Sequence, residues 1–137
     1  MDDIFLLDTS FVVAFLGRDV PTPVRVRMEQ LVSEDSAATN ALIRTEVLVG
    51  CRNPEDYERV SVRMQALQSL PLENFVWERA SKLGFDLRRV GLSVGVSDLV
   101  IAATALHNQA TLLHMDSDFE LIAQHSDLRT ESYLDIA

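Results

Sequence analysis

Short apolar runs alternate along this chain with longer stretches whose apolar residues recur every three or four positions. Residues 4–7 form a continuous apolar run before Asp8, which predicts a strand buried on both faces of a parallel sheet. Thr9 and Ser10 then supply hydroxyl groups that can cap a helix, and Gly17 closes that helix. A strand that ends in an aspartate and leads directly into a helix builds sites at the carboxyl edge of a sheet.

The same alternation continues to the carboxyl end of the chain. Helical spacing and capping residues predict helices over residues 24–33, 40–51, 53–70 and 77–90, one that Asp98 opens, and a short one around residues 119–122. Short strands are expected at residues 37–39 and 71–76, just before Asp116, and as an edge strand within 128–136. Strands that alternate with helices in this way predict an α/β sandwich around a mainly parallel sheet, in one domain over residues 1–137.

Charge and cysteine content narrow the class of protein. The net charge of −9 argues against a generally cationic nucleic-acid coat, although eleven of the twelve basic residues are arginines, which suit bidentate contacts with phosphate. The single cysteine, Cys51, cannot form an internal disulfide, and neither a signal sequence nor an apolar run of membrane-spanning length is evident. We therefore expect a reducing, cytoplasmic setting and no membrane partner.

Four acidic residues fall where separate elements could bring them together. Asp8 and Asp116 follow apolar strands, Asp98 begins a helix after the Gly91 to Gly95 loop, and Glu46 lies among apolar neighbours on its helix. Two carboxylates about 4 Å apart repel by roughly 4 kcal/mol at an effective dielectric near 20, so such a cluster requires a cation. Oxygen-only ligands favour Mg²⁺ or Mn²⁺ over Zn²⁺.

Other interpretations of these residues are also available. Asp98 could act only as a helix N-cap. Ser117 and Glu120 have the spacing of a capping box, which predicts that Asp116 is free for another role and that Asp118 is a solvated first-turn acid outside the core of the site. The histidines are assigned no catalytic role, because a metal-activated water removes the need for them.

Taken together, these motifs resemble those of a known family. They are Asp8-Thr9-Ser10 after the first strand, Glu46 in a mid-chain helix, Gly91-x3-Gly95-x2-Asp98 followed by Leu-Val-Ile-Ala-Ala, and residues 115–119, Met-Asp-Ser-Asp-Phe. Their order and spacing over nearly the whole chain are similar to those of PIN-domain ribonucleases, particularly VapC-type toxins. One departure is His114, at a position where such sequences often carry a small hydroxyl residue.

The resemblance implies a fold, an activity and partners. It implies a PIN-like three-layer sandwich in which Asp8, Glu46, Asp98 and Asp116 bind Mg²⁺ or Mn²⁺ and are catalytic, with Ser10 and Asp118 as auxiliary residues. It also implies an endoribonuclease toxin that cleaves structured RNA of the tRNA or rRNA class, forms a homodimer and is neutralised by a VapB-like antitoxin.

Two other functions remain open from the sequence. Asp8 could be the covalent nucleophile of a phosphatase, although the chain lacks a second aspartate two residues later. Alternatively, the chain could be a non-enzymatic acidic module that binds a basic partner, as the net charge of −9 permits.

Overall fold

A central sheet of five parallel strands organises the chain in the computed structural model, which describes residues 3–136. The strands lie in the spatial order β3-β2-β1-β4-β5. In chain order they are β1 (Phe5–Leu7), β2 (Ala37–Thr39), β3 (Gln68–Ser69), β4 (Thr111–His114) and β5 (Arg129–Ser132). The helices are α1 (Thr9–Leu16), α2 (Thr22–Ser33), α3 (Ala41–Val49), α4 (Pro54–Met64), α5 (Asn74–Arg89), α6 (Val96–Asn108) and α7 (Ser117–Gln124), followed by a 3-10 turn, η1 (Leu134–Ile136).

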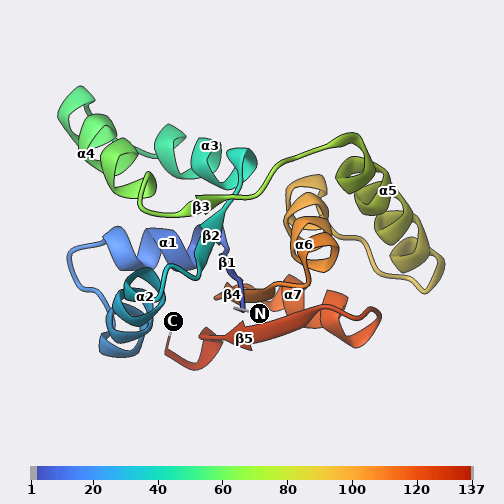
Figure 1. Ribbon diagram of the computed structural model, residues 1–137. Helices are drawn as coiled ribbons and strands as arrows, with labels where there is room; N and C mark the ends of the chain where they lie inside the picture. The colour runs from blue at the N-terminus through green and yellow to red at the C-terminus, as the bar shows by residue number, and fades with distance from the viewer. Residues whose placement is uncertain (1–2, 137) are drawn as a thin grey trace.

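Helices cover both faces of the sheet, which gives the α/β sandwich expected from the sequence. Figure 1 shows α1 and α2 on one side of the strands, with α6 and, outside it, α5 on the other. This arrangement follows from strand order, because right-handed crossovers toward β2 and back toward β4 place their helices on opposite faces. The prediction of a three-layer α/β fold is therefore confirmed, and every strand pairing is parallel.

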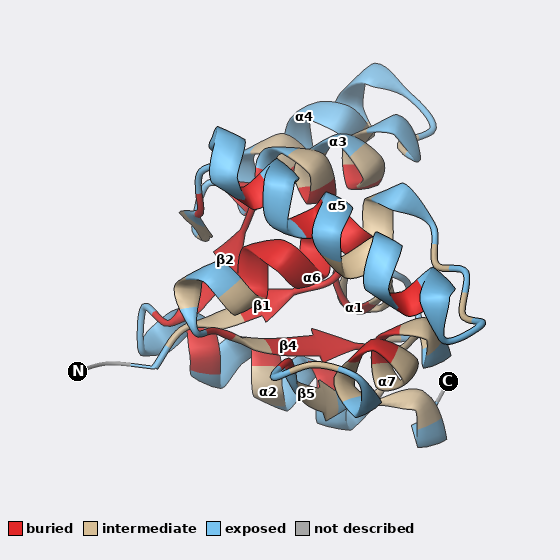
Figure 2. Ribbon diagram, turned by 90° about the vertical axis from the view of Figure 1, so that its right-hand side faces the viewer, coloured by how far each residue is buried: buried red, intermediate tan, exposed pale blue. Residues whose placement is uncertain are grey.

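The apolar core lies between the central strands and α6. Figure 2 shows β1, β4 and most of α6 as buried. Leu6 and Leu112 are fully buried register partners, and the small residues of α6 allow that helix to lie against the sheet. Burying one such leucine contributes about 1.5–3 kcal/mol to stability, so β1 and β4 are firmly fixed relative to each other. On the outer side, Gly84 permits close contact with α6, because a Cβ there would lie 2.6 Å from Leu99 Cδ1.

The strand register brings two distant chain segments to the same edge of the sheet. Leu7 is paired with Leu113, and the N–H of Asp8 donates to the Leu113 carbonyl at 2.9 Å. Both chains leave the sheet in the same direction because the strands are parallel. The residues after β1 and β4 therefore start their loops side by side.

Several local predictions are confirmed. Asn40 caps α3 by accepting from the Ile43 N–H at 2.8 Å, and β5 is the parallel edge strand expected near the carboxyl end. Gly91 ends the α5 segment with a φ of 86°, a conformation that glycine adopts without strain. The predicted helix over residues 24–33 begins two residues earlier, at Thr22.

The segment between α4 and α5 was predicted incorrectly. The expected helix over residues 53–70 ends at Met64, and the expected strand over 71–76 is replaced by β3 and the start of α5 at Asn74. Leu70 donates its N–H to the Thr39 carbonyl at 2.8 Å, so the chain is drawn into the sheet where helical spacing of apolar residues continued. Pairing with β2 overrides the local helical pattern here.

Candidate active site

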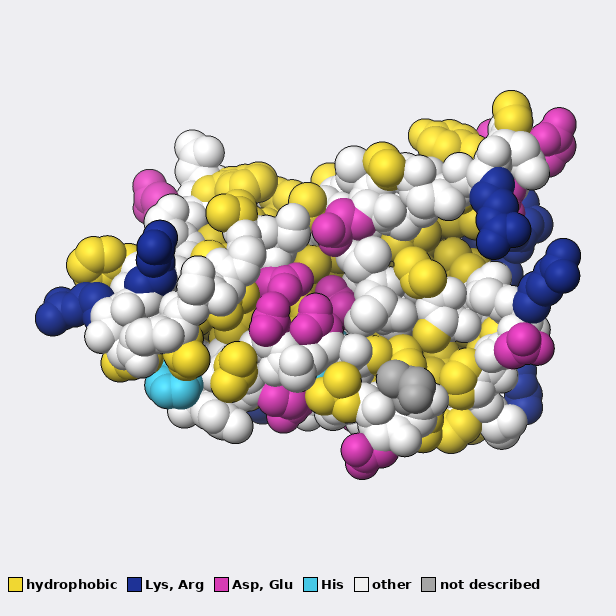
Figure 3. Space-filling model, turned by 180° about the vertical axis from the view of Figure 1, so that it is seen from behind, with side chains coloured by type: hydrophobic (Ala, Val, Ile, Leu, Met, Phe, Trp, Pro, Cys, Tyr) yellow, Lys and Arg dark blue, Asp and Glu magenta, His cyan; other side chains and the backbone are white. Residues whose placement is uncertain are grey.

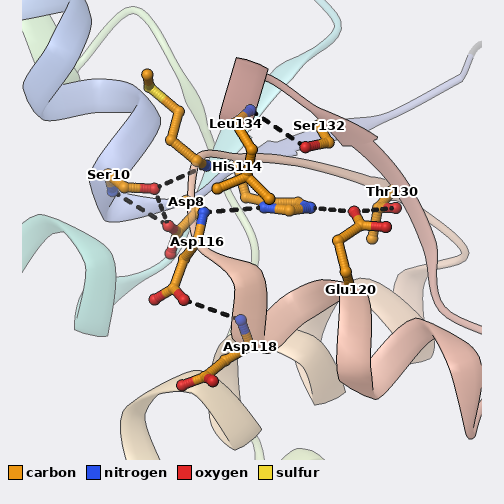
Figure 4. Close-up of polar contacts among 10 residues, drawn as sticks. Asp8, Ser10, His114, Asp116, Asp118, Glu120, Thr130, Ser132 and Leu134 are labelled. Carbon is orange, nitrogen blue, oxygen red and sulfur yellow. Dashed lines mark hydrogen bonds and ion pairs between the residues drawn. The ribbon is translucent and has the colours of Figure 1, made fainter. Parts of the chain in front are cut away.

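Asp8 leaves β1 at the sheet edge and is the N-cap of α1. Its Oδ2 accepts from the Ser10 N–H at 3.1 Å and from the Ser10 hydroxyl at 2.5 Å. Ser10 Oγ in turn accepts from the Met115 N–H at 3.0 Å, so one hydroxyl joins the segment after β1 to the segment after β4 (Figure 4). Asp8 is only 3% exposed, and this burial raises the pKa of its carboxyl despite the Ser10 hydrogen bonds. The repulsion from Asp116 acts in the same direction.

Glu46 on α3 is held by the residue next to Asp8. The Thr9 hydroxyl donates to Glu46 Oε1 at 2.6 Å, which explains how an acid survives beside apolar neighbours. The N-terminal end of α3 is also fixed, because the buried side-chain amide of Asn40 donates to Thr104 Oγ1 on α6 at 3.0 Å. This bond ties the helix that carries Glu46 to the helix that carries Asp98.

Asp98 lies in the first turn of α6, and Gly95 rather than Asp98 is the cap residue of that helix. Its pKa is raised from 3.8 to about 7, first because burial disfavours the charge and then because of Asp116, Asp8, Asp118 and Glu46. Four other carboxylates lie close enough to favour the protonated form of Asp98, so negative charge is concentrated in this region. The acids predicted from the sequence to converge therefore do act on one another.

Asp116 follows β4 and caps α7, which corrects the sequence-based prediction. Its Oδ1 accepts from the Asp118 N–H at 2.9 Å, and its own N–H donates to His114 Nδ1 at 3.1 Å. Glu120 does not complete a capping box with Ser117; it accepts from Thr130 Oγ1 at 3.0 Å and contacts His114 Nε2 at 2.7 Å. Polar partners on β4 and β5, the buried His114 and the partly buried Thr130, thus determine the position of Glu120.

His114 has a structural position behind the acids. It is fully buried, and its ring lies between Asp116 and Glu120 in Figure 4. Because Nδ1 accepts a backbone N–H, Nε2 carries the proton and donates to Glu120. The ring therefore fixes the backbone at Asp116 and faces away from the acidic cluster.

Asp98, Asp116 and Asp118 form the tightest group of acids. Each offers a ligand atom, and these atoms lie within 4.8 Å of one another. Asp118 was expected outside the core of the site, but the first turn of α7 directs it beside Asp116. Asp8 and Glu46 lie outside this group but close enough to raise the pKa of Asp98. Figure 3 shows the acidic side chains gathered near the middle of one face of the molecule.

The donor set fits a hard divalent cation. The group offers carboxylate oxygens only, all partly exposed, and burial together with repulsion among the acids raises the pKa of Asp98 to about 7. A bound cation reverses the sign of that repulsion, and oxygen ligands suit Mg²⁺ or Mn²⁺. Asp98, Asp116 and Asp118 could contact such an ion directly, with Asp8 and Glu46 bordering it.

Three contacts in this region were not found from the sequence. They are the Thr9 to Glu46 bond, the Asn40 to Thr104 bond, and the His114 to Glu120 pair. From the sequence, the hydroxyl at Thr9 and the amide at Asn40 are expected only as helix caps, because a local pattern gives no information on partners 37 and 64 residues away.

The fold described above is shared with a known protein family. The family model described as PIN domain matches residues 5–124, and the chain belongs to the PIN-domain family. It is 35% identical over 122 residues to ribonuclease VapC21 of Mycobacterium tuberculosis strain ATCC 25618 / H37Rv, a match that covers 87% of this chain and 86% of the relative. Within the family, the chain therefore groups with the VapC ribonucleases.

Solved structures show the same fold at lower identity. The VapBC2 structure from Rickettsia felis, bound to a DNA fragment from its promoter, contains a chain that matches with a TM-score of 0.82 and 21% identity over 95% of this chain and 98% of that one. Mycobacterium tuberculosis VapC20, described as a toxin that cleaves the sarcin-ricin loop, matches with a TM-score of 0.66 and 16% identity over 91% and 98% of the two chains. These likenesses establish the fold.

Proposed function

We propose that this protein is a Mg²⁺- or Mn²⁺-dependent endoribonuclease that acts as the toxin of a VapBC-type toxin–antitoxin pair in the cytoplasm. The observation that carries the proposal is the convergence of Asp98, Asp116 and Asp118 within 4.8 Å at the carboxyl edge of a PIN-domain sheet. In this proposal Asp8, Glu46, Asp98 and Asp116 are the catalytic acids and Asp118 assists them. The similarity to ribonuclease VapC21 supports the reaction class.

The neighbouring residues support this role by fixing the acids before substrate arrives. Ser10 holds Asp8, and Thr9 holds Glu46 through its hydroxyl. Asp116 is fixed by the N–H of Asp118 and, through its backbone, by His114. A divalent cation bound here supplies activation of a water molecule and stabilisation of charge on the phosphodiester. Pre-positioned acids lose little entropy on binding the ion and substrate.

Structured RNA is the substrate class that we assign. VapC20, which shares the fold, is described as cleaving the sarcin-ricin loop, an RNA element. A cluster of carboxylates on an open face, rather than in a deep cavity, is compatible with a large substrate that presents one bond. We extend the proposal to RNA of the tRNA or rRNA class on these grounds.

The nuclease proposal is tested by metal-dependent cleavage. Purified protein is incubated with total tRNA and rRNA in Mg²⁺ or Mn²⁺, with EDTA as the metal-free condition. We expect discrete cleavage that EDTA abolishes, and a loss of at least about 100-fold in rate for Asp116→Asn, because a lost ligand removes transition-state stabilisation. Asp127→Asn, at an exposed aspartate outside the cluster, is the matched control and should cleave normally. Metal-independent cleavage, or wild-type rates in Asp116→Asn, would refute the assignment.

A surface groove supports the antitoxin part of the proposal. A groove of about 390 Å³ lies between α1, α2 and α4, and its lining is largely apolar, with Phe15, Met28 and Val32 among its residues. Apolar side chains in a groove suit the apolar face of an amphipathic helix. A VapB-like antitoxin that buries such a helix here would use surface that is otherwise exposed to water.

Antitoxin binding can be separated from catalysis by substitutions on α2. Val32 lines the groove and is 39% exposed, whereas Val26 on the same helix is 52% exposed and does not line it. Val32→Glu should weaken binding of the adjacent-gene antitoxin at least about tenfold by placing a charge in the apolar contact, and should leave RNA cleavage intact. Val26→Glu is the control. Equal binding by both variants in calorimetry would contradict this location.

Homodimerisation is part of the proposal as well. Large apolar side chains on α5, including Trp77 at 44% and Phe85 at 57% exposure, give this helix an uncovered apolar surface. Light scattering of the free toxin measures its mass directly. We expect twice the chain mass at micromolar concentration, and a monomer would remove this element of the proposal.

A further inference from the structure

A second cavity adjoins the acidic cluster and is lined by three arginines. It measures about 660 Å³ and lies between the end of α1, the inner side of α3 and the start of α4. Its charged lining residues are two acids, Glu46 and Asp56, and three arginines, Arg18, Arg52 and Arg59. Because Glu46 is one of the proposed catalytic acids, the cavity borders the proposed active site through this residue.

The arginines differ in how they are engaged. Arg59 forms an ion pair with Asp56 and holds the pKa of that carboxyl below its usual value. Arg18, in the turn after α1, and Arg52, in the loop before α4, are exposed and make no ion pair with any residue in the range 3–136. The exposed guanidinium groups of Arg18 and Arg52 thus border one cavity, and Arg52 also lies near Asp56, whose pKa is lowered chiefly by Arg59 and to a lesser extent by Arg52.

These cations lie in a chain with a net charge of −9. Three of its eleven arginines line one cavity next to a cluster of acids that repels a polyanion. Figure 3 shows the same separation, with acids in the middle of the face and Lys and Arg side chains toward its two ends. A guanidinium group recognises phosphate oxygens through paired N–H donors, which compensates locally for that repulsion.

The rest of the cavity suits a nucleotide base. Val13 and Leu16 from α1 and Val60 from α4 form apolar parts of its lining. A base has apolar faces and polar edges, and the volume exceeds what one nucleotide requires. The combination of an apolar wall with two exposed arginines is complementary to a single unpaired nucleotide.

We propose that this cavity is a subsite for the RNA nucleotide next to the scissile bond, with Arg18 and Arg52 binding its phosphate. The proposal rests on the nuclease function proposed above and adds the residues that position its substrate. Arg59 keeps the rim ordered through Asp56 and offers its remaining N–H groups to the same strand. Val13 and Leu16 contact the base. Because these residues touch RNA away from the acids, they determine substrate binding and leave the chemical step to the acidic cluster.

The test compares two variants of equal charge. Arg18→Ala/Arg52→Ala removes both proposed phosphate contacts, and Arg25→Ala/Arg79→Ala removes two arginines that do not line the cavity. Steady-state cleavage of a fluorescent RNA hairpin that wild-type protein cuts is measured over a series of KCl concentrations. Thermal unfolding of every variant confirms that the fold is retained.

We expect the cavity variant to raise KM by about threefold to tenfold per arginine with little change in kcat, since partly exposed charge-assisted hydrogen bonds are lost. The salt dependence distinguishes direct contact from general charge. Each phosphate contact on single-stranded nucleic acid contributes about 0.7 to the slope of log(kcat/KM) against log[KCl], so the slope should fall by about 1.4 in the cavity variant. The charge-matched control should keep the wild-type slope, and Arg18→Lys/Arg52→Lys should largely restore it.

The two proposals fail in different ways. If wild-type protein cuts no RNA in any divalent metal, the nuclease function fails. If wild-type protein cuts RNA but both double variants have the same KM and the same salt slope, the subsite is refuted and the nuclease function stands. Weakened antitoxin binding with unchanged RNA kinetics in the cavity variant would also refute it and assign the arginines to the protein partner.

Discussion

Asp98 should destabilise the metal-free protein at neutral pH, so Asp98→Asn is expected to be more stable than wild type when no divalent ion is bound. The pKa of Asp98 is raised from 3.8 to about 7, mainly by burial and then by the four surrounding acids. Its carboxylate makes no hydrogen bond to another residue within 3–136, so the amide replaces a charge without breaking a contact. The substitution therefore removes the cost of burying the charge and the repulsion from the other acids, and it breaks no hydrogen bond.

The magnitude follows from the two pKa values. Below pH 3.8 the carboxyl is protonated in both the folded and the unfolded chain, and it contributes nothing. Between 3.8 and about 7 the folded protein retains a proton that the unfolded chain has lost, so the free energy of unfolding falls as pH rises and then levels off. At 1.36 kcal/mol per pKa unit the full effect is about 4 kcal/mol. Partial exposure of Asp98 reduces this to about 1–3 kcal/mol.

Thermal and urea unfolding of chelator-treated protein provides the assay. Near pH 8, Asp98→Asn should exceed wild type by about 1–3 kcal/mol, or roughly 3–10 °C in Tm for a chain of this size, and the gap should narrow toward pH 4. Excess Mn²⁺ should stabilise wild type and have little effect on the variant, because the ion binds only the folded acidic cluster. Asp127→Asn controls for loss of a surface charge. A variant that is less stable than wild type at both pH values, and equally stabilised by Mn²⁺, would refute the reasoning.

Three further substitutions probe the contacts behind the acids. Ser10→Ala leaves the Met115 N–H without its partner and removes the hydroxyl hydrogen bond to Asp8, so calorimetric unfolding should show a loss of about 1–3 kcal/mol and titration a weaker affinity for Mn²⁺. Thr9→Val keeps the shape of the side chain but frees Glu46; stability should change by less than about 1 kcal/mol, while Mn²⁺ affinity falls about tenfold. Asn40→Ala removes a helix cap and the bond to Thr104 in the interior, and should cost about 2–4 kcal/mol in urea unfolding.

Matched controls separate these effects from general sensitivity to substitution. Ser33→Ala and Thr45→Val each remove an exposed hydroxyl that bonds only its own helix backbone, and neither should alter Mn²⁺ affinity. Equal metal affinity in Thr9→Val and wild type would mean that the Thr9 bond does not position Glu46 for the ion. Unchanged stability of Asn40→Ala would show that α3 and α6 are held together by apolar contacts alone.

The sequence predicts most of the fold because its signals there are local. The apolar run before Asp8, the cap at Asn40 and the glycine at 91 each act within a few residues, and the structure retains all three. Prediction failed between α4 and α5, where only two residues enter the sheet as β3. A strand this short has no alternating pattern of its own, and its existence depends on pairing with β2.

The cap of α7 near Asp116 was predicted incorrectly from the sequence for a different reason. The Ser117 to Glu120 spacing is a valid capping signal, but Glu120 also lies opposite Thr130 and the buried His114. A hydrogen bond to an interior imidazole competes with a cap bond that water can replace, and the interior partner prevails. Asp116 then takes the cap and, through the same turn, brings Asp118 toward Asp98. Competition between partners from different strands cannot be read from spacing.

The position of the site follows from strand order rather than from any single motif. The chain runs outward from β1 through β2 to β3, then returns across the sheet to place β4 on the other side of β1. That return makes the ends of β1 and β4 neighbours. Asp8 and Asp116 lie far apart in the sequence, but their segments meet at one edge of the sheet, where the Ser10 hydroxyl bonds to Asp8 and to the Met115 N–H. At such a reversal the helices that follow the strands diverge to opposite faces and leave the edge open. Acids that repel one another can gather there because the apolar pairing of β1 with β4 holds their segments together. A bound cation relieves this repulsion, which increases the affinity of the site for the ion.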